Sequence, residues 1–334
     1  MAKLISIVIP NRNGAATIEL CLEAAYRSIY EPFEVIVVDD ASEDRSIDVI
    51  GRYPCRLVRL DLHSGAAAAR NAGAKESHGE ILFFTDADCL LEPDALGIAA
   101  DAVSQYGPDV IVGGTYTPDP YDTDFFSHFQ SLFVHYSETK NAEAADYVAG
   151  HAMVIDAMTF RQSGGFSERF LPVAEDVEFS HRLRRAGHRI VIDPRLRVRH
   201  IFRFSLYRSL RNAAFKSMYW TVYSIRNKDV LADSGTASTE LKANLVFCFV
   251  ALAFLFMSVT NGSALFLHLT ALSVAANVIV GRGLITAFFK GGGVVFGMAA
   301  TAYYLSLFPL AVGAGALAGT VRHIASSRQR RQPG

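Results

Sequence analysis

Two aspartates one residue apart, Asp86 and Asp88, follow an apolar run at 80–85. Such a run predicts a strand buried on both faces, so the two carboxylates fall where this strand leaves its sheet. Side chains two positions apart on an extended chain point the same way, so both can face one point. Two hard oxygen ligands suit Mg²⁺ or Mn²⁺, which often bridge to substrate phosphates. A polar turn before the helix that Pro93 begins is the competing explanation.

Alternating strand and helix patterns around this pair predict an α/β fold with a mostly parallel sheet. The expected strands cover 4–9, 35–38, 56–60, 80–85 and 109–113. Two further strand ends carry polar groups, Pro10-Asn11-Arg12 and Asp39-Asp40. Because the carboxyl ends of parallel strands share one edge of a sheet, all three groups converge there. One acidic turn has a structural explanation, but three at the same edge indicate a ligand site.

Four motifs in register resemble the family 2 glycosyltransferases of GT-A fold. They are Ser6 to Asn13, Glu34 to Ser42, Gly65 to Gly73, and Asp86-Ala87-Asp88. The resemblance implies a Rossmann-like nucleotide-diphospho-sugar transferase fold and a nucleotide-sugar donor, with a UDP-sugar as first choice. It implies donor contacts from Pro10, Asn11, Arg12, Asp39, Asp40, Gly65, Arg70 and Asp86. Asp39 and Asp40 would hold the nucleoside, because carboxylates accept from base N–H and ribose hydroxyl groups. Arg70 would lie near the diphosphate, whose geometry a guanidinium fits. The family often has Asn two residues before the first glycine of the third motif, and this chain has His63 there.

The same resemblance assigns the chemistry of the second half of this domain. It makes Asp176, beside Glu175, the general base that takes a proton from the acceptor hydroxyl, and a single base with in-line attack gives inversion. Both carboxylates would open a helix that runs to Arg185, where they also suit the helix dipole. His200 would join Asp86 and Asp88 as a ligand of Mn²⁺ or Mg²⁺. A lone histidine is more often structural.

The C-terminal part of the chain predicts membrane insertion. Hydrophobic residues make up 51% of the sequence, and the net charge of −1 gives no field that favours nucleic acid. Residues 205–229 predict an amphipathic, basic interfacial helix or a helix packed on the first domain. Three apolar runs follow at 244–260, 263–280 and 293–320, each close to the roughly 20 residues that span a bilayer. Three crossings would put the basic C-terminal tail outside, against the positive-inside rule, so two or three crossings remain possible.

These patterns together predict three regions. They are a catalytic domain at 1–203 with a nucleotide-sugar half (1–113) and an acceptor half (114–203), an interfacial helix and linker at 204–240, and a transmembrane region with a basic tail at 241–334. A helix expected at 125–139 has an apolar stripe that suits either core packing or an acceptor or membrane contact. Small residues at Gly313, Gly315 and Gly319 suit helix contacts, within the chain or in a homo-oligomer.

The predicted function is metal-assisted transfer of a single sugar to a lipid-linked or membrane-proximal acceptor. The enzyme would sit in the inner, cytoplasmic membrane as a multi-pass protein, with its catalytic domain in the cytoplasm. One alternative is a polyprenyl-phosphate glycosyltransferase, whose acceptor is already an anion and needs no base. The other is a non-catalytic, nucleotide-binding subunit of a membrane complex.

Overall fold

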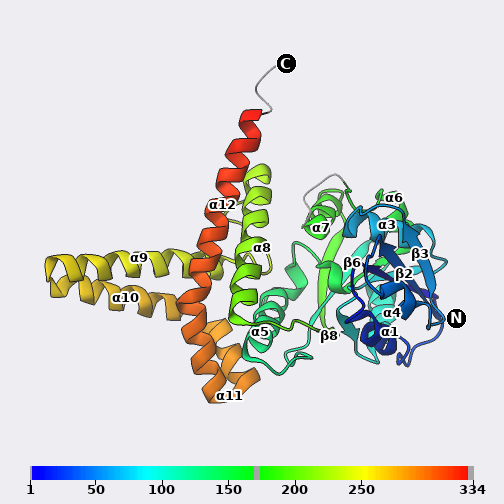
Figure 1. The fold of residues 1–334 in the computed structure, drawn as a ribbon, viewed down its shortest axis with the longest axis horizontal. Coiled ribbons are helices and arrows are strands. Elements are labelled where there is room, and N and C mark those ends of the chain that lie inside the picture. Colours follow the sequence, from blue (N-terminus) through cyan, green and yellow to red (C-terminus); the bar gives the residue numbers. More distant parts are fainter. Residues whose placement is uncertain (1, 169–173, 330–334) are drawn as a thin grey trace. The chain divides into compact units, whose positions relative to one another are not determined.

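The structure, a computed structural model, describes residues 2–168 and 174–329 (Figure 1). The chain packs as two units, which we call the sheet unit (residues 1–122 and 138–202) and the helical unit (residues 123–137 and 203–334). Arg330 and Arg331 of the predicted basic tail lie outside the described residues.

An eight-stranded sheet forms the core of the sheet unit. Its strands are β1 (Ile5–Asn11), β2 (Phe33–Asp40), β3 (Arg56–Leu60), β4 (Ile81–Phe84), β5 (Cys89–Leu91), β6 (Val110–Tyr116), β7 (Met153–Asp156) and β8 (Arg189–His200). They lie in the order β3-β2-β1-β4-β7-β6-β8-β5. The pairs β3–β2, β2–β1 and β1–β4 are parallel, as expected, and β6–β8 is parallel as well. β7 is antiparallel to both of its neighbours, and β5 is antiparallel to β8, so the sheet is mixed.

Helices connect these strands. They are α1 (Ile18–Ala25), α2 (Ser46–Ile50), α3 (Ala66–Lys75), α4 (Ala95–Tyr106), α6 (Ala157–Gln162) and α7 (Glu175–Arg185), with short 3₁₀ turns at Ala142–Ala144 and Gly150–Ala152. The βα units of the first half are buried as their apolar runs predict. β7 and α6 were not predicted, because the four residues of β7 follow a glycine-bearing loop and lack the length that marks a strand.

Gly73 has a different role from the one that the sequence suggests. A glycine after an Ala-rich run predicts the end of a helix, but α3 continues to Lys75. A Cβ at Gly73 would overlap the Val8 side chain and lie 3.0 Å from Cγ2 of Val38. Gly73 therefore lets α3 pack closely on β1 and β2. Gly65, with φ of 90°, precedes α3 in a backbone conformation that favours glycine.

Replacing Gly73 by Ala is expected to lower the free energy of unfolding by about 1–3 kcal/mol, because the extra methyl overpacks this interface. Gly97→Ala is the matched control, since Gly97 also lies inside a helix, α4, and a Cβ there meets nothing within 4 Å. The control should gain up to about 1 kcal/mol from helix propensity. Thermal melting of the purified variants tests this, and equal melting midpoints would contradict it.

The helical unit contains α5 (Phe125–Thr139), up to Ser137, followed by α8 (Leu206–Asn227), α9 (Thr239–Asn261), α10 (Ala264–Val280), α11 (Arg282–Leu305) and α12 (Leu307–Gln329). The apolar stripe of α5 lies in the core of this unit. The Phe129 ring is 4.8 Å from that of Tyr303, and the Phe133 ring is 5.3 Å from that of Phe308. Core packing thus explains the stripe.

The third apolar run does not form one continuous helix. The chain bends at Gly293, where φ is 76°, and breaks again at Ser306 between α11 and α12. Pro309 does not interrupt the run, because it lies in the first turn of α12, where proline is tolerated. Two segments, Thr239–Asn261 and Arg282–Ser326, are long and apolar enough to cross a membrane, and α10 is a shorter apolar helix.

Candidate active site

The carboxyl edge of the sheet brings the ends of β1 and β2 together. The strand register pairs Asn11 with Asp39, and the Asn11 side chain donates a 3.0 Å hydrogen bond to Asp39. The second oxygen of Asp39 accepts the backbone N–H of Ser42. These bonds fix the Asp39 carboxylate at the strand end, with Asn11 behind it as support.

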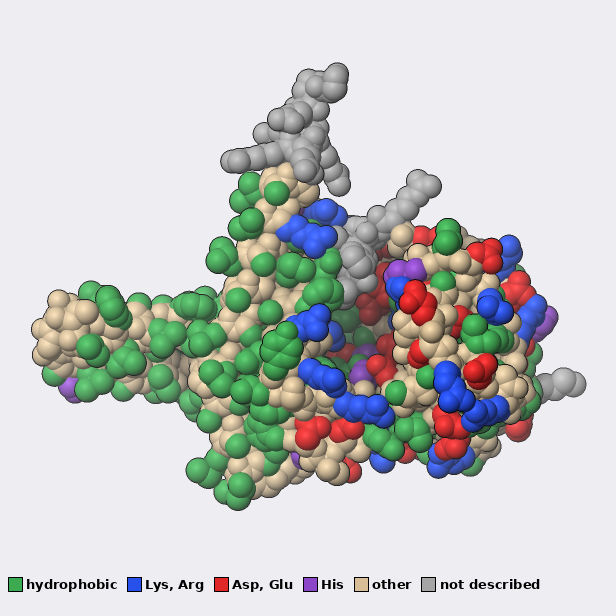
Figure 2. Space-filling view, in the orientation of Figure 1, with side chains coloured by type: hydrophobic (Ala, Val, Ile, Leu, Met, Phe, Trp, Pro, Cys, Tyr) green, Lys and Arg blue, Asp and Glu red, His purple; other side chains and the backbone are tan. Residues whose placement is uncertain are grey.

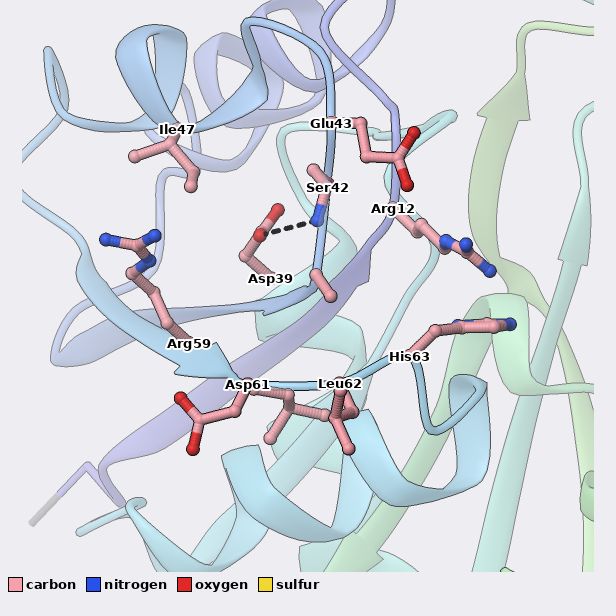
Figure 3. Close-up of a pocket in the computed structure, with 11 residues that line it drawn as sticks. Arg12, Asp39, Ser42, Glu43, Ile47, Arg59, Asp61, Leu62 and His63 are labelled. Carbon is pink, nitrogen blue, oxygen red and sulfur yellow. Dashed lines mark hydrogen bonds between the residues drawn. The ribbon is translucent and has the colours of Figure 1, made fainter.

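A pocket of about 730 Å³ opens beside Asp39. In Figure 3, Asp39 lies between Arg59 on one side and Arg12 with His63 on the other. A nucleoside needs such a set of donors and acceptors around an open site. Arg12 and Asp39, for which the sequence predicted donor contacts, line this pocket, and so do Arg59 and Ser42, which were not predicted.

Asp40 is not among the residues that line this pocket. Its carboxylate accepts the N–H groups of Ser64 and Gly65 at 2.6 and 2.9 Å, and the His63 ring lies 2.7 Å from it. Asp40 is buried, so it organises the loop that opens α3. The structure thus separates the two neighbouring aspartates, with Asp39 at the pocket and Asp40 beneath the loop. Pro10 is also not among the residues that line the pocket.

Arg70 is buried between two carboxylates. Its guanidinium donates to Asp86 at 2.7 Å and to Glu175 at 2.6 Å, and only 4% of the residue is exposed. A Cβ on Gly150 would lie 2.6 Å from Nη2 of Arg70, so glycine gives the guanidinium its room. Arg70 therefore joins the end of β4 to the start of α7 rather than standing at an open surface.

The charges of this cluster shift its pKa values. Burial alone would raise the pKa of Asp86, but Arg70, His151 and His200 together outweigh burial and lower it. Burial raises the pKa of Glu175, against the opposing effect of Arg70. The carboxylates in turn outweigh the effect of burial on Arg70 and hold its pKa above its usual value. Arg70 therefore stays charged.

Asp88 and His200 form the second half of the site. The register pairs Cys89 with His200, and the Ile201 N–H donates to the Asp88 carbonyl. This pairing sets Nε2 of His200 3.5 Å from Oδ1 of Asp88. Burial, with the charge of Asp86, raises the pKa of Asp88.

The residues around this pair fit a divalent cation. Ligand atoms of Asp88, Cys89 and His200 all lie within 4.8 Å of one another. Burial raises the pKa of the Cys89 thiol, which stays protonated and is a poor ligand. A carboxylate oxygen and an imidazole nitrogen remain, and both suit Mn²⁺. Asp86 lies on the same loop, but one of its oxygens is engaged with Arg70.

Asp176 lies at the start of α7, next to Glu175. One of its oxygens accepts the Gly150 N–H at 2.9 Å, and the other accepts the N–H of Val177. The side chain is only partly buried, and α7 begins after Ala174, whose φ is 88°. The structure thus gathers Asp86, Arg70, Glu175, Gly150 and Asp176 in one connected group.

Sequence reasoning missed a buried pair behind this group. Nε2 of His151 lies 3.5 Å from Oε2 of Glu138, and both side chains are over 90% buried. The Tyr116 ring stacks on His151 at 4.1 Å, and the His151 carbonyl accepts from Thr85 at the end of β4. The sequence offers one local sign of this pair, a histidine within the apolar segment 148–155. Its partner Glu138 lies 13 residues away in the sequence, so no short motif joins the two.

A mixed sheet with a pocket and an acidic pair at its carboxyl edge is typical of the GT-A fold. Comparison with solved structures agrees. The mannosyltransferase PcManGT from Pyrobaculum calidifontis, in complex with GDP-Man and Mn²⁺, aligns with a TM-score of 0.60 at 19% identity, over 98% of this chain and 88% of that one. GalNAc-T7 with UDP, GalNAc and Mn²⁺ aligns with a TM-score of 0.50 at 16% identity, over 66% of this chain and 50% of that one. The predicted GT-A fold is confirmed.

Sequence comparison gives the family. Residues 6–163 match the model of glycosyl transferase family 2, so the chain carries a family 2 glycosyltransferase domain. GlyG of Streptococcus pneumoniae, a glycosyltransferase, is 28% identical over 38% of this chain and 44% of its own length. AglE of Haloferax volcanii, also a glycosyltransferase, is 32% identical over 33% of this chain and 38% of its own. An uncharacterized glycosyltransferase of Haemophilus influenzae is 29% identical over 53% of this chain and 60% of its own. The chain thus spans about half the length of these relatives.

Proposed function

We propose that this protein is a membrane-anchored, inverting glycosyltransferase that moves one sugar from a nucleotide-diphosphate donor to a lipid-linked or membrane-proximal acceptor. A UDP-sugar is the first candidate donor. The supporting observation is that the Asp39 pocket, the Asp88–His200 pair and Asp176 belong to one sheet unit. The first two lie at strand ends. Asp176 lies at the start of α7, which Arg70 connects to the end of β4. The fold likeness to enzymes with GDP-Man or UDP supports a nucleotide donor.

In this proposal each residue has one role. Asp39 binds the ribose or base, and Arg12 and Arg59 provide positive charge at the pocket. Asp88 and His200 would hold Mn²⁺ or Mg²⁺, with Asp86 beside them. A bound cation would supply positive charge to the departing diphosphate. Arg70 sets the orientation of Asp86 and Glu175, because it donates to both.

The transfer step then needs a base on the acceptor side. Asp176 takes the proton of the acceptor hydroxyl. The acceptor oxygen then bonds to the anomeric carbon, while the bond from that carbon to the diphosphate breaks. The Gly150 N–H holds the Asp176 carboxylate in place. Glu175 is a positioning residue, since its oxygen accepts from Arg70.

A donor screen tests the nucleotide and metal parts of the proposal. Detergent-purified protein is melted with UDP-, GDP- or dTDP-sugars in the presence of Mn²⁺, Mg²⁺ or EDTA. One nucleotide class should stabilise the protein by about 2.7 kcal/mol at 100 times its Kd. EDTA and Asp88→Asn should remove this shift, while Asp101→Asn, an exposed carboxylate on α4, should retain it. Folded protein that shifts with none of these donors would contradict the proposed donor site and favour a non-catalytic assembly subunit.

The membrane anchor that we propose is the α9–α10 hairpin. At about 1.5 Å per residue, α9 is roughly 35 Å long, enough for a hydrocarbon core of about 30 Å. No Asp, Glu, Lys or Arg occurs from Ala243 to Gly281. Large apolar side chains are exposed on both helices, such as Phe256 at 69% and Leu265 at 63%.

α12, by contrast, would lie along the membrane surface rather than cross it. It packs closely on α8, because Cβ atoms at Gly315 and Gly319 would overlap the carbonyls of Ala214 and Met218. α8 carries exposed basic residues in its first three turns, including Arg211 and Lys216, which are costly in a bilayer core. A helix that runs against α8 shares its environment, so the chain would cross twice and end in the cytoplasm.

Cysteine labelling tests this topology. In intact cells, a membrane-impermeant maleimide should label Ser263→Cys in the hairpin turn but reach Ser326→Cys near the end of α12 only after permeabilisation. The parent chain is the control, since three of its four cysteines are buried. Labelling of Ser326→Cys from outside would instead indicate three crossings.

A further inference from the structure

The helical unit contains an apolar pocket that the proposed reaction does not use. It has a volume of about 400 Å³ and is lined by α5, α8, α9, α12 and the segment between α8 and α9. Its walls are mainly aliphatic and aromatic, including Phe133, Ile225, Leu245, Phe308 and Val312. A pocket of this size and lining suits an apolar ligand or part of one.

The pocket also has a basic side. Lys216 lines it and is exposed, and within the described parts of the chain no ion pair joins this ammonium to a carboxylate. Asn212 lines the pocket one turn before Lys216 on α8, and Arg208 lies one turn before Asn212 on the same face of the helix. Figure 2 shows Lys and Arg side chains along α8 beside hydrophobic ones. The ligand that complements this arrangement is therefore amphiphilic and anionic.

The exposed part of the lining suits a membrane rather than water. Leu231 and Val230 line the pocket from the segment after α8, and they are 84% and 49% exposed. Apolar side chains on a loop next to a basic helix are typical of a surface that lies in the headgroup region of a bilayer.

We propose that this pocket binds a single anionic phospholipid, with one hydrocarbon chain among α8, α9 and α12 and the phosphate at Lys216. Apolar burial gives the affinity, and the ammonium–phosphate contact selects an anionic head group. The site is independent of the sugar-transfer chemistry and would persist in a variant without transferase activity.

Trp220 makes this proposal directly testable, because it lines the pocket and is the single tryptophan of the chain. Bromine atoms on a lipid chain quench tryptophan fluorescence on contact. Detergent-purified protein is titrated with dibrominated phosphatidylglycerol or with dibrominated phosphatidylcholine that has the same chains. The anionic lipid should quench saturably, with a half-point at least fivefold lower than that of the zwitterionic lipid.

Two pairs of variants separate the pocket from general lipid contact. Lys216→Gln should remove the preference for the anionic lipid, while Arg226→Gln, a basic residue of α8 outside the lining, should keep it. Ala316→Phe fills the pocket and should reduce quenching, while Ala318→Phe on the exposed side of α12 should not.

Several results would overturn the proposal. Equal half-points for the two lipids, or an unchanged preference in Lys216→Gln, would mean non-selective lipid contact. Absence of quenching by either lipid would mean that no chain enters the pocket. Unchanged gel-filtration elution and circular dichroism of each variant verify that its fold is retained. The transferase can fail every donor assay without affecting any of these outcomes.

Discussion

Replacement of Arg70 by Met should abolish sugar transfer and lower the free energy of unfolding by about 3–5 kcal/mol. The residue is 4% exposed, and its guanidinium donates hydrogen bonds of 2.7 and 2.6 Å to Asp86 and Glu175. Its removal leaves two carboxylates close together without a counter-charge. With about 2–4 °C per kcal/mol for a domain of this size, the melting midpoint should fall by roughly 6–20 °C.

Arg56→Met is the matched control for this loss. Arg56 also pairs with a carboxylate, that of Glu76, but both side chains are at least a third exposed. A surface pair contributes about 0–1 kcal/mol, so this variant should melt close to the parent protein. Equal melting of the two Arg→Met variants would contradict a structural role for the buried cluster.

A second substitution separates stability from activity. Arg70→Met combined with Glu175→Gln removes one of the two unpaired charges, so part of the lost stability should return. Activity should not return, because Asp86 still lacks the guanidinium that orients it. Recovery of transfer in the double variant would show that Arg70 acts only by neutralising Glu175.

The first half of the fold was predictable because its signals are local. Each parallel strand is an apolar run that ends in a turn, and the polar strand ends share one edge of the sheet by the rule for parallel strands. The parallel pairing of β1, β2, β3 and β4 follows these runs. β7 escaped prediction because its four residues adjoin a glycine-bearing turn, and its antiparallel pairing with β4 and β6 depends on contacts distant in sequence.

The candidate site was only partly predictable for the same reason. Residue types and spacing pointed to Asp39 and Asp88, and the family resemblance pointed to His200. The structure places Asp88 beside His200 through the β5–β8 register. The motif could not show that Asp40 turns beneath the α3 loop. Nor could it show that Arg70 meets Glu175, which is 105 residues away. Such partners are set by tertiary packing, which no local pattern encodes.

The membrane region illustrates a different limit. Hydropathy located the apolar runs, but it treats α12 like any spanning helix. The glycines of α12 face α8, and this close contact between a glycine-bearing helix and a basic one supports a surface position. In the proposed topology with two crossings, the basic C-terminal end stays in the cytoplasm and the positive-inside rule is obeyed.

Replacement of Asp176 by Asn should lower kcat by about 10²–10⁴-fold if the acceptor is a neutral hydroxyl, because the amide cannot take its proton. The amide oxygen can still accept from Gly150 or from Val177, but not from both, so about 1 kcal/mol of stability should be lost. Donor binding should be unaffected, since Asp176 does not line the Asp39 pocket. The thermal shift with the donor should therefore persist while turnover falls.

The same variant distinguishes the two enzyme hypotheses. A polyprenyl-phosphate acceptor attacks as an anion and needs no base, so Asp176→Asn would then keep turnover near the parent value. Glu178→Gln is the matched control, because Glu178 lies on the same turn of α7 but pairs with Arg182. If Asp176→Asn keeps its activity and Glu175→Gln loses it, Glu175 would be the base. That outcome would move the base from Asp176 to Glu175, although one oxygen of Glu175 already accepts a hydrogen bond from Arg70.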